Sequence, residues 1–179
     1  CRGYIVTGEL KYITFTTDMG WVGISSSARG LVRLTLPQSS AQGTLEPLGS
    51  SLSRTTQSLD SFGDIISRLR SYFGGKKTVF PDELDLSQST HFKRQVWQIT
   101  KLIPYGESRS YRWLAVKIGK PNAMRAVGQA LAKNPLPIII PCHRVVASNG
   151  KLGGYSGGLE MKKRLLHLEA TGASVKATK

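Results

Sequence analysis

The amino-acid sequence predicts an α+β fold: an N-terminal antiparallel β-sheet domain with a helix, followed by a mostly helical C-terminal domain that contains a helix-turn-helix. Segments rich in β-branched and aromatic residues occur in the first third of the chain, and apolar residues recur at helical spacing after it. An acidic stretch, PDELDLSQST, separates the two parts. The chain of 179 residues is long enough for two small domains, which we place at residues 1–88 and 89–179.

The N-terminal half contains three predicted strands and one predicted helix. The strands, which short turns join into an expected antiparallel meander, are 12–17, 21–26 and 30–36. Residues 37–58 are rich in Ser, Gln, Gly and Thr without periodicity, which is typical of a surface loop. A helix is predicted over residues 59–73, because its apolar residues share one face and two glycines follow it. We expect the acidic residues 81–88 to form an extended linker.

Four helices are predicted in the C-terminal half, over residues 90–102, 111–118, 123–133 and 158–170. Ser110 is placed to cap the second of these helices, and a four-residue turn containing Gly119 separates it from the third. The segment 134–141 holds three prolines, which exclude a helix and predict an extended run into Cys142. The dipeptide Asn149–Gly150 predicts a hairpin turn between VVAS and KLGGY.

The positive charge of the chain lies in its C-terminal half. Residues 91–179 carry 16 Lys and Arg and only three Glu, a net charge of +13, against +14 for the whole chain. This distribution predicts contact with a polyanion such as nucleic acid; the alternative is a basic surface without a partner. A membrane partner is disfavoured, because the basic residues are spread over several elements and no apolar run reaches the ~20 residues of a membrane span.

Cysteine usage and the first residues bear on the compartment. Cys1 and Cys142 alone cannot build a disulfide framework, and the residues CRGYIVTGEL lack the charged and apolar regions of a secretion signal. We therefore expect a cytoplasmic protein, associated with the nucleoid in a prokaryote or nuclear in a eukaryote. Two Cys and three scattered His do not match a structural zinc spacing, so no metal is expected.

The helices predicted over 111–118 and 123–133 have the proportions of a helix-turn-helix. The second helix is rich in small residues, among them Ala123, Ala126 and Gly128. Small side chains allow a helix backbone to approach a groove wall closely, and Arg125 can then project towards bases or phosphates. The same composition would equally suit a helix packed tightly against a neighbour.

Cys142 is a candidate nucleophile because of its neighbours in the run PCHRVV. The thiolate is the reactive form, and its pKa falls beside positive charge, which His143 and Arg144 can supply. His143 can also act as a base, and Glu169 is the best candidate to orient its imidazole. Adjacent side chains on a strand point to opposite faces, so a useful Cys142–His143 contact requires a turn at 141–143 or a bridging water. The alternative is a buried structural cysteine beside a surface histidine.

A glycine-rich segment, GGYSGG, begins about a dozen residues after Cys142. Glycines allow close backbone approach to a flat ligand, and Tyr155 offers a stacking surface. A phosphate-binding P-loop is excluded because no Gly-Lys-Ser/Thr ending is present. The alternative is a flexible exit from the predicted hairpin.

Together these residues resemble a known family. The block NPLPIIIPCHRVVASNGKLGGYSGG is similar to the active-site region of the O6-alkylguanine-DNA alkyltransferases, also called methylated-DNA–protein-cysteine methyltransferases, and the resemblance extends over residues 91–170. It implies an RNase H-like N-terminal domain and direct, irreversible transfer of an alkyl group from O6-alkylguanine to Cys142. It also implies minor-groove binding to double-stranded DNA that contains alkylated guanine, base flipping, and no cofactor. Residues 1–90 contain Cys1 but no His, so the zinc site of some members is not expected here.

The resemblance further implies roles for individual catalytic residues. Cys142 is the alkyl acceptor, activated by His143 through a water molecule that Glu169 helps to hold. Asn134 is a hinge residue that bonds the backbone near the active site. Tyr111 crowds the phosphate beside the target nucleotide and presents its hydroxyl to the base.

Binding residues follow from the same resemblance. Arg125 is the finger that fills the base stack after the nucleotide leaves, on the helix whose small residues enter the minor groove. Lys162 occupies a position where the family commonly has Lys. The implied pocket residues, with backbone groups of Cys142, Val145 and Ser156 against the guanine edge, are Pro137, Val145, Tyr155 and Ser156.

Three rival functions remain open at this point. A non-catalytic alkyltransferase-like damage sensor would carry another residue, commonly Trp, where this chain has Cys142. A Cys–His–Glu hydrolase would leave the helix pair and the +13 charge unexplained. A helix-turn-helix regulator would need several base-reading side chains, and the second helix offers only Arg125 and Gln129. We expect a monomer, with cooperative assembly on DNA left open.

Overall fold

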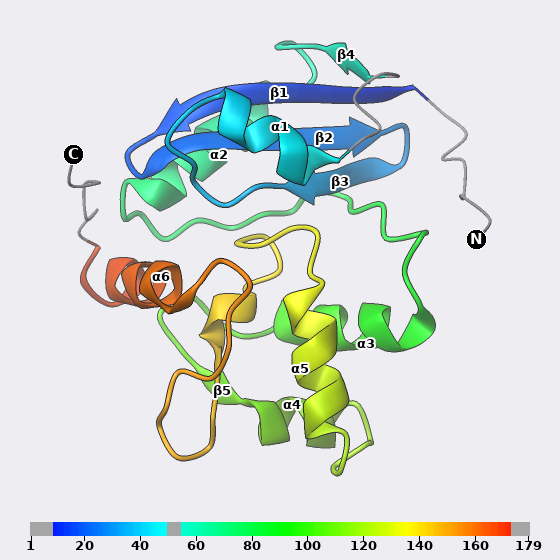
Figure 1. The fold of residues 1–179 in the computed structure, drawn as a ribbon, viewed down its shortest axis with the longest axis vertical. Helices are drawn as coiled ribbons and strands as arrows, with labels where there is room; N and C mark the ends of the chain where they lie inside the picture. The colour runs from blue at the N-terminus through cyan, green and yellow to red at the C-terminus, as the bar shows by residue number, and fades with distance from the viewer. Residues whose placement is uncertain (1–8, 50–54, 173–179) are drawn as a thin grey trace.

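The N-terminal half is built on a four-stranded sheet of order β3-β2-β1-β4 (Figure 1). The computed structural model describes residues 9–49 and 55–172, and the strands are β1 Leu10–Thr17, β2 Gly20–Ser27, β3 Gly30–Leu34 and β4 Thr55–Gln57. The predicted antiparallel meander of the first three strands is confirmed, with Ile13 opposite Ile24 in the β1–β2 register. Strand β4 pairs with β1 in parallel and was not predicted.

The predicted surface loop over 37–58 is wrong in part. It contains helix α1, Gln42–Leu48, as well as β4, while residues 50–54 lie outside the described part of the chain. Helix α1 buries only Thr44 and Leu48, so its sequence carries too few apolar residues to show a helical period. It packs on β2 at Gly23, where a Cβ atom would lie 2.8 Å from Leu48 Cδ1.

Helix α2, Gly63–Phe73, packs against β1, behind the sheet in the view of Figure 1. It begins four residues later than predicted, and Leu59 is 66% exposed and outside it. The buried face of α2 packs into the hydrophobic core and consists of Ile65, Ile66, Leu69, Tyr72 and Phe73.

The four predicted C-terminal helices are confirmed within one or two residues at most ends. They are α3 His91–Thr100, α4 Tyr111–Lys117, α5 Met124–Ala132 and α6 Leu159–Thr171. Ser110 caps α4 as predicted, with its Oγ accepting a hydrogen bond from Trp113 N at 3.0 Å. Among the described residues, no helix is long and apolar enough to cross a membrane.

The segment 134–141 is not helical, but the prediction of an extended run is wrong. Pro137 and Ile140 form a bridge across a tight turn, and Ile138 takes a φ of 75°, a conformation that β-branched residues rarely adopt. The turn is anchored to the sheet, because Leu34 N donates to Pro135 O at 2.9 Å. This contact places the chain before Cys142 against β3.

The linker makes a further connection between the halves. The acidic linker is extended as predicted, and it runs beside β3 through hydrogen bonds between Leu31 and residues 83 and 85.

Within the C-terminal half, the short strands β5 Arg109–Ser110 and β6 Val145–Val146 pair in parallel. The predicted Asn149–Gly150 turn is present, with Gly150 N donating to Ala147 O, but no described strand follows it, so the hairpin is wrong.

The buried apolar residues of the two halves form one continuous cluster. It extends from Val22 and Ile24 of the sheet through Tyr72 of α2 to Trp97 of α3 and Leu165 of α6. The division at residue 88 therefore stays a prediction, and the two halves share a core. Residues of α2 consequently reach side chains of the helical half.

Candidate active site

The helix-turn-helix exposes one face of α5. Val127, Ala130 and Leu131 are buried against α3 and α4, and Trp97 Nε1 donates to Ala130 O at 3.0 Å. The opposite face is exposed and consists of Met124, Arg125, Ala126 and Gln129. The helix therefore presents a single basic side chain among small and neutral ones.

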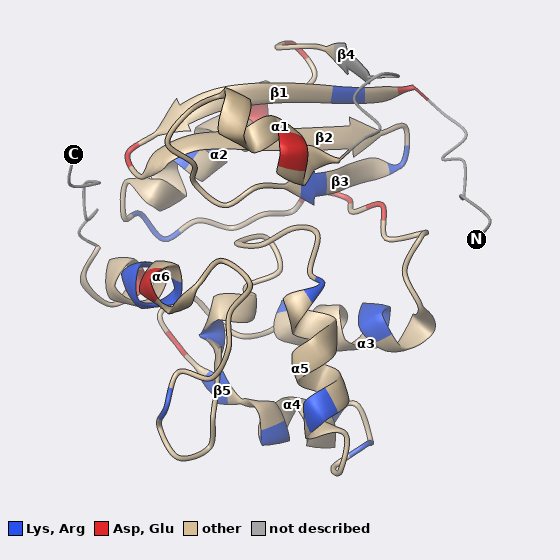
Figure 2. Cartoon of the chain, viewed as in Figure 1, with Lys and Arg blue, Asp and Glu red and all other residues tan. Residues whose placement is uncertain are grey.

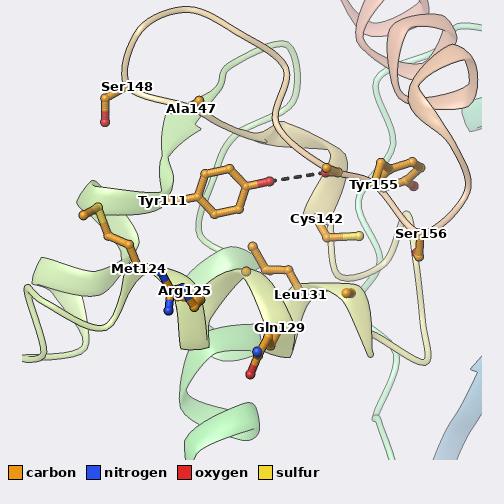
Figure 3. A pocket seen from close by; sticks show the side chains of 13 residues that line it. Tyr111, Met124, Arg125, Gln129, Leu131, Cys142, Ala147, Ser148, Tyr155 and Ser156 are labelled. Carbon is orange, nitrogen blue, oxygen red and sulfur yellow. Dashed lines mark hydrogen bonds between the residues drawn. The ribbon is translucent and has the colours of Figure 1, made fainter.

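A cavity of about 660 Å³ lies between α5 and the loop 147–156 (Figure 3). Its volume is in the range of small-molecule sites. The structure brings together in its lining seven of the residues singled out in the sequence: Tyr111, Arg125, Gly128, Gln129, Cys142, Tyr155 and Ser156. Sequence reasoning did not place Met124, Leu131, Ala132, Ala147, Ser148 and Gly154 there.

Cys142 opens a single 3₁₀ turn, Cys142–Arg144, which supplies the turn that a Cys–His site requires. The thiol is buried, and Asn134 Nδ2 lies 3.1 Å from Sγ and 2.8 Å from Ile140 O. Burial raises the pKa of Cys142, although the hydrogen bond from Asn134 and the charge of Lys162 act to lower it. The expected lowering of this pKa by neighbouring positive charge is therefore wrong, because desolvation outweighs it.

His143 and Glu169 are in direct contact with each other. His143 Nε2 lies 2.6 Å from Glu169 Oε1, and both side chains are buried. Burial lowers the pKa of His143 despite the carboxylate beside it, so the imidazole is neutral at pH 7. Its Nδ1 is buried and has no hydrogen-bond partner among the described residues. This nitrogen is the atom through which the imidazole can accept a proton.

Glu169 is held by several donors at once. Arg144 donates to it from Nε, at 2.9 Å from Oε2, and from a terminal nitrogen, at 2.9 Å from Oε1, while Gly106 N lies 3.0 Å from Oε2. Tyr72 donates its hydroxyl to Oε1 at 2.7 Å. Burial alone would raise the pKa of Glu169, but the bonds and charges of His143 and Arg144 hold it well below its usual range. The carboxylate is therefore ionised in the folded protein.

The glycine-rich segment is fixed by Lys162 of α6. Its buried ammonium donates to the carbonyl oxygens of Val145 at 2.6 Å, of Gly154 at 3.2 Å, and of Leu152. Burial lowers the pKa of Lys162 to about 8. The bonds tie the loop after Cys142 to α6, so the structure disfavours the alternative of a flexible exit.

Tyr111 closes the cavity against the same loop. Its hydroxyl donates to Gly154 O at 3.3 Å (Figure 3). Gly153 has a φ of 69°, and a Cβ there would lie 2.7 Å from the Tyr111 ring. Glycine is required at position 153 for both reasons.

Four of the predicted pocket and DNA-binding residues lie outside the lining of this cavity. Pro137 borders a smaller neighbouring cavity of about 280 Å³, which also touches Asn134 and Ser156. Val145 is fully buried, with its carbonyl oxygen bonded to Lys162. Ala123 and Ala126 lie on α5 or at its start without lining the cavity. Their implied roles stay predictions.

Sequence reasoning missed Tyr72, and it assigned Arg144 no partner. Tyr72 continues the apolar face of its helix, so its position predicts nothing beyond a core residue. Its hydroxyl nevertheless reaches Glu169, 97 residues later. Only two signals were available for Arg144, its place next to His143 and the scarcity of acids in this half. In the described chain, no group of three or more His, Cys, Asp or Glu is arranged to hold a metal ion.

Comparisons with known proteins agree with this geometry. The family model described as 6-O-methylguanine DNA methyltransferase, DNA binding domain, matches residues 91–171. A methylated-DNA–protein-cysteine methyltransferase of Mycolicibacterium paratuberculosis is 41% identical over 162 residues, which cover 89% of this chain and 92% of the relative. A constitutive Bacillus subtilis methyltransferase of the same description is 40% identical over 88% of this chain and 94% of its own length.

A solved structure extends the likeness to three dimensions. The crystal structure of Mycobacterium tuberculosis OGT in complex with DNA matches with a TM-score of 0.79 and 39% identity, covering 92% of this chain and 96% of that one. The likeness thus includes both the sheet and the helical half. The chain belongs to the family of methylated-DNA–protein-cysteine methyltransferases, which repair O6-methylguanine in DNA by direct reversal.

Proposed function

We propose that Cys142 is the residue that accepts the alkyl group from O6-alkylguanine in double-stranded DNA. One observation carries this assignment: Cys142 lines the cavity beside α5, and the next residue in the chain, His143, is in hydrogen-bond contact with Glu169. A nucleophile, a neutral base and a carboxylate that can stabilise the protonated base are thereby brought to one site.

The transfer step balances without a cofactor. The thiol gives its proton to His143 Nδ1, directly or through one water molecule, and the thiolate attacks the alkyl carbon. The bond between that carbon and guanine O6 breaks, and the electron pair leaves with the base. A proton from the Tyr111 hydroxyl or from water neutralises the base, and Tyr111 regains it from solvent. The product is a thioether on Cys142, so each protein molecule reacts once.

The raised pKa of Cys142 suits this order of events. A buried thiol that stays protonated is a weak nucleophile towards solutes in general. Proton removal is then coupled to the arrival of a base in the cavity. The same burial makes the thiolate a strong nucleophile once it forms, because little solvent surrounds it.

Helix α5 is the element that we assign to the minor groove. The relative from Mycobacterium tuberculosis was crystallised in complex with DNA, and its fold matches this chain over both halves. The exposed Arg125 stands at the rim of the cavity, where it can fill the stack that a flipped nucleotide leaves. The alkyl group of a stacked guanine is out of reach of Cys142, so the nucleotide must leave the duplex.

We further propose that the protein acts as a monomer. Cys142, His143, Glu169 and Tyr111 all come from one chain, so a single copy contains these four groups of the proposed site. Cooperative assembly on DNA is a separate property, which sedimentation on long and short duplexes would measure.

Mass spectrometry tests the assignment of Cys142. After incubation with a duplex that contains one O6-methylguanine, we expect a gain of one methyl group on the Cys142 peptide and one transfer per protein molecule. The same duplex with unmodified guanine is the control. Cys142→Ala should bind the duplex with unchanged affinity and transfer nothing. Repeated turnover, or a methyl group on another residue, would contradict the proposal.

A further inference from the structure

Tyr72 is a fully buried side chain of the N-terminal half that reaches the active site. It lies in the last turn of α2, and its ring packs edge-on against Phe73, Phe80 and Tyr105, with centroid distances of 5.3, 6.1 and 6.0 Å. Three edge contacts leave the ring one orientation. The position of its hydroxyl is therefore determined by the packing between the two halves.

The Tyr72 hydroxyl touches both members of the His143–Glu169 pair. It donates to Glu169 Oε1 at 2.7 Å and lies 3.3 Å from His143 Nε2. An ionised carboxylate can only accept hydrogen bonds, so the single hydroxyl proton of Tyr72 points to Glu169. The lone pairs of the Tyr72 oxygen are then the part of the hydroxyl available to His143.

This bonding determines which nitrogen of His143 carries the proton. Both groups next to Nε2, the Glu169 carboxylate and the Tyr72 oxygen, act as acceptors, so Nε2 must be the protonated nitrogen of the neutral ring. Nδ1 then carries the free lone pair. It is also the buried ring atom without a hydrogen-bond partner among the described residues. The basic nitrogen of His143, Nδ1, is thus the one that does not face Glu169.

We propose that Tyr72 is a positioning residue for the alkyl transfer: its hydroxyl holds Glu169 and keeps His143 in the tautomer with the proton on Nε2, so that Nδ1 accepts the proton of Cys142. The inference rests on the proposed function, since it assigns a role within the same transfer step. It makes the N-terminal half part of the reaction machinery, because the hydroxyl comes from α2. Burial, together with Glu169, raises the pKa of Tyr72 well above 10.0, so the hydroxyl keeps its proton at neutral pH.

The charges around His143 determine the sign of the expected effect. The titratable and charged groups around the His143–Glu169 pair come from α2, the segment before β5, the 3₁₀ turn, the glycine-rich loop and α6. They are Tyr72, Tyr105, Cys142, Arg144, Tyr155 and Lys162. Removing the Tyr72 hydroxyl takes one donor from Glu169 Oε1 and changes no formal charge. The carboxylate then becomes a stronger acceptor for His143 and raises the pKa of the imidazole. More of the base is protonated at a given pH, and transfer slows.

Tyr72→Phe and Tyr105→Phe form a matched pair for the test. Each removes one hydroxyl from the same aromatic cluster, but the Tyr105 hydroxyl donates to Gly75 O at 3.3 Å and not to Glu169. The measurement is the single-turnover rate of methyl transfer from about pH 5 to about pH 9. For Tyr72→Phe we expect the acidic limb to move up by as much as ~1 pH unit, with transfer slowed about tenfold on that limb and restored at high pH.

For Tyr105→Phe, the acidic limb of the pH–rate profile should lie at the same pH as in the unchanged protein. Both variants should keep the affinity of the unchanged protein for the duplex. A Tyr72→Phe rate that falls equally at every pH would mean a packing role and overturn the inference. An unchanged limb would overturn it as well. Incorporating 3-fluorotyrosine at position 72 gives a second variant that keeps the hydroxyl and makes it a stronger donor, so the limb should move to lower pH.

Nitrogen NMR of His143 in the free protein tests the tautomer without any reaction. We expect the Nε2 signal of a protonated nitrogen and the Nδ1 signal of a free lone pair, with the pKa raised in Tyr72→Phe. A proton on Nδ1 would contradict the inference even if methyl transfer occurs. If the unchanged protein fails to methylate Cys142, the proposed function fails, and this NMR result still decides the role of Tyr72.

Discussion

At the residue scale, the active site is dominated by the cost of burying ionisable groups. Cys142, His143 and Glu169 are all buried, with at most 6% of each residue exposed. Burial keeps the first two neutral, whereas Glu169 stays ionised because Arg144 and other donors surround it. The site therefore holds one buried ion pair, Arg144–Glu169, next to a neutral thiol and a neutral base. Its reactivity is latent until a proton moves.

The Glu169 carboxylate should make the folded state sensitive to acid. The pKa of Glu169 is below its ordinary value of 4.5 and that of His143 is below 6.5, so at acidic pH the unfolded chain binds more protons than the folded one. Stability is thus fully present above pH 6.5 and falls as the pH drops through 6.5 and 4.5. Thermal unfolding as a function of pH measures this.

Glu169→Gln isolates the contribution of the carboxylate. The variant leaves Arg144 buried without its partner charge, and we expect a loss of about 3 kcal/mol at pH 7. Its stability should then change less than that of the unchanged protein between pH 7 and pH 4. Glu160→Gln on the same helix is the control, since Glu160 pairs with Lys163 at the surface and its loss should change stability by less than about 1 kcal/mol. Equal acid sensitivity of the two variants would contradict the prediction.

At the element scale, the glycine-rich loop depends on one backbone position and one lysine. Lys162 donates to the carbonyl oxygen of Gly154 in the loop and to those of Val145 and Leu152 before it. Tyr111 packs directly on Gly153. The loop forms one wall of the cavity because these contacts fix its path. Its conformation is therefore coupled to the helix-turn-helix, on which Tyr111 is the first residue of α4.

Gly153→Ala should disturb this wall. A Cβ at position 153 would lie 2.7 Å from the Tyr111 ring, on a backbone with a φ of 69°, so either Tyr111 or the loop must move. We expect a loss of about 1–3 kcal/mol in stability and a slower methyl transfer. Gly128→Ala is the matched control for stability, because a Cβ there lies 3.9 Å from Tyr111 on a helical backbone. That variant should be stabilised by up to about 1 kcal/mol; destabilisation similar to that of Gly153→Ala would refute the argument.

Sequence reasoning predicted most of the helical half because its elements are long and strongly periodic. It failed where local signals are weak or opposed. Helix α1 buries too few apolar residues to be detected, and the turn at Ile138 adopts a conformation that its residue type disfavours. The pKa of Cys142 was predicted in the wrong direction, because neighbouring charges are visible in a sequence and burial is not.

At the scale of the whole molecule, the net positive charge is concentrated in the helical half, where residues 91–179 carry +13 of the total +14. In Figure 2 the Lys and Arg of α3, α4, α5 and β5 lie in the half of the molecule opposite the four-stranded sheet. The exposed basic residues of this half include Lys101, Arg112, Lys117, Lys120, Arg125, Lys133 and Lys151. Contacts of these residues with phosphates carry no sequence information, which suits a protein that must find a rare lesion in any DNA.

Duplex binding should therefore weaken steeply with salt and show little sequence preference. If about six phosphates are contacted, affinity should fall by about a thousandfold between about 50 mM and about 200 mM salt. Arg125→Gln should reduce the slope of log affinity against log salt by up to about one. Lys11→Gln, on the exposed part of β1, is the control and should leave the slope unchanged. A slope near zero for the unchanged protein would contradict binding through the basic half.

The sequence by itself determined the fold class, the helix pair, the basic half and the cysteine that we propose as the nucleophile. Each of these depends on residues that are close in the chain or on overall composition. Only the tertiary structure decided how the nucleophile is controlled. Glu169 meets His143 across 26 residues, and Tyr72 meets Glu169 across 97. The shared core of the two halves brings these groups within hydrogen-bond distance and excludes water from them, and this exclusion sets the protonation state of Cys142.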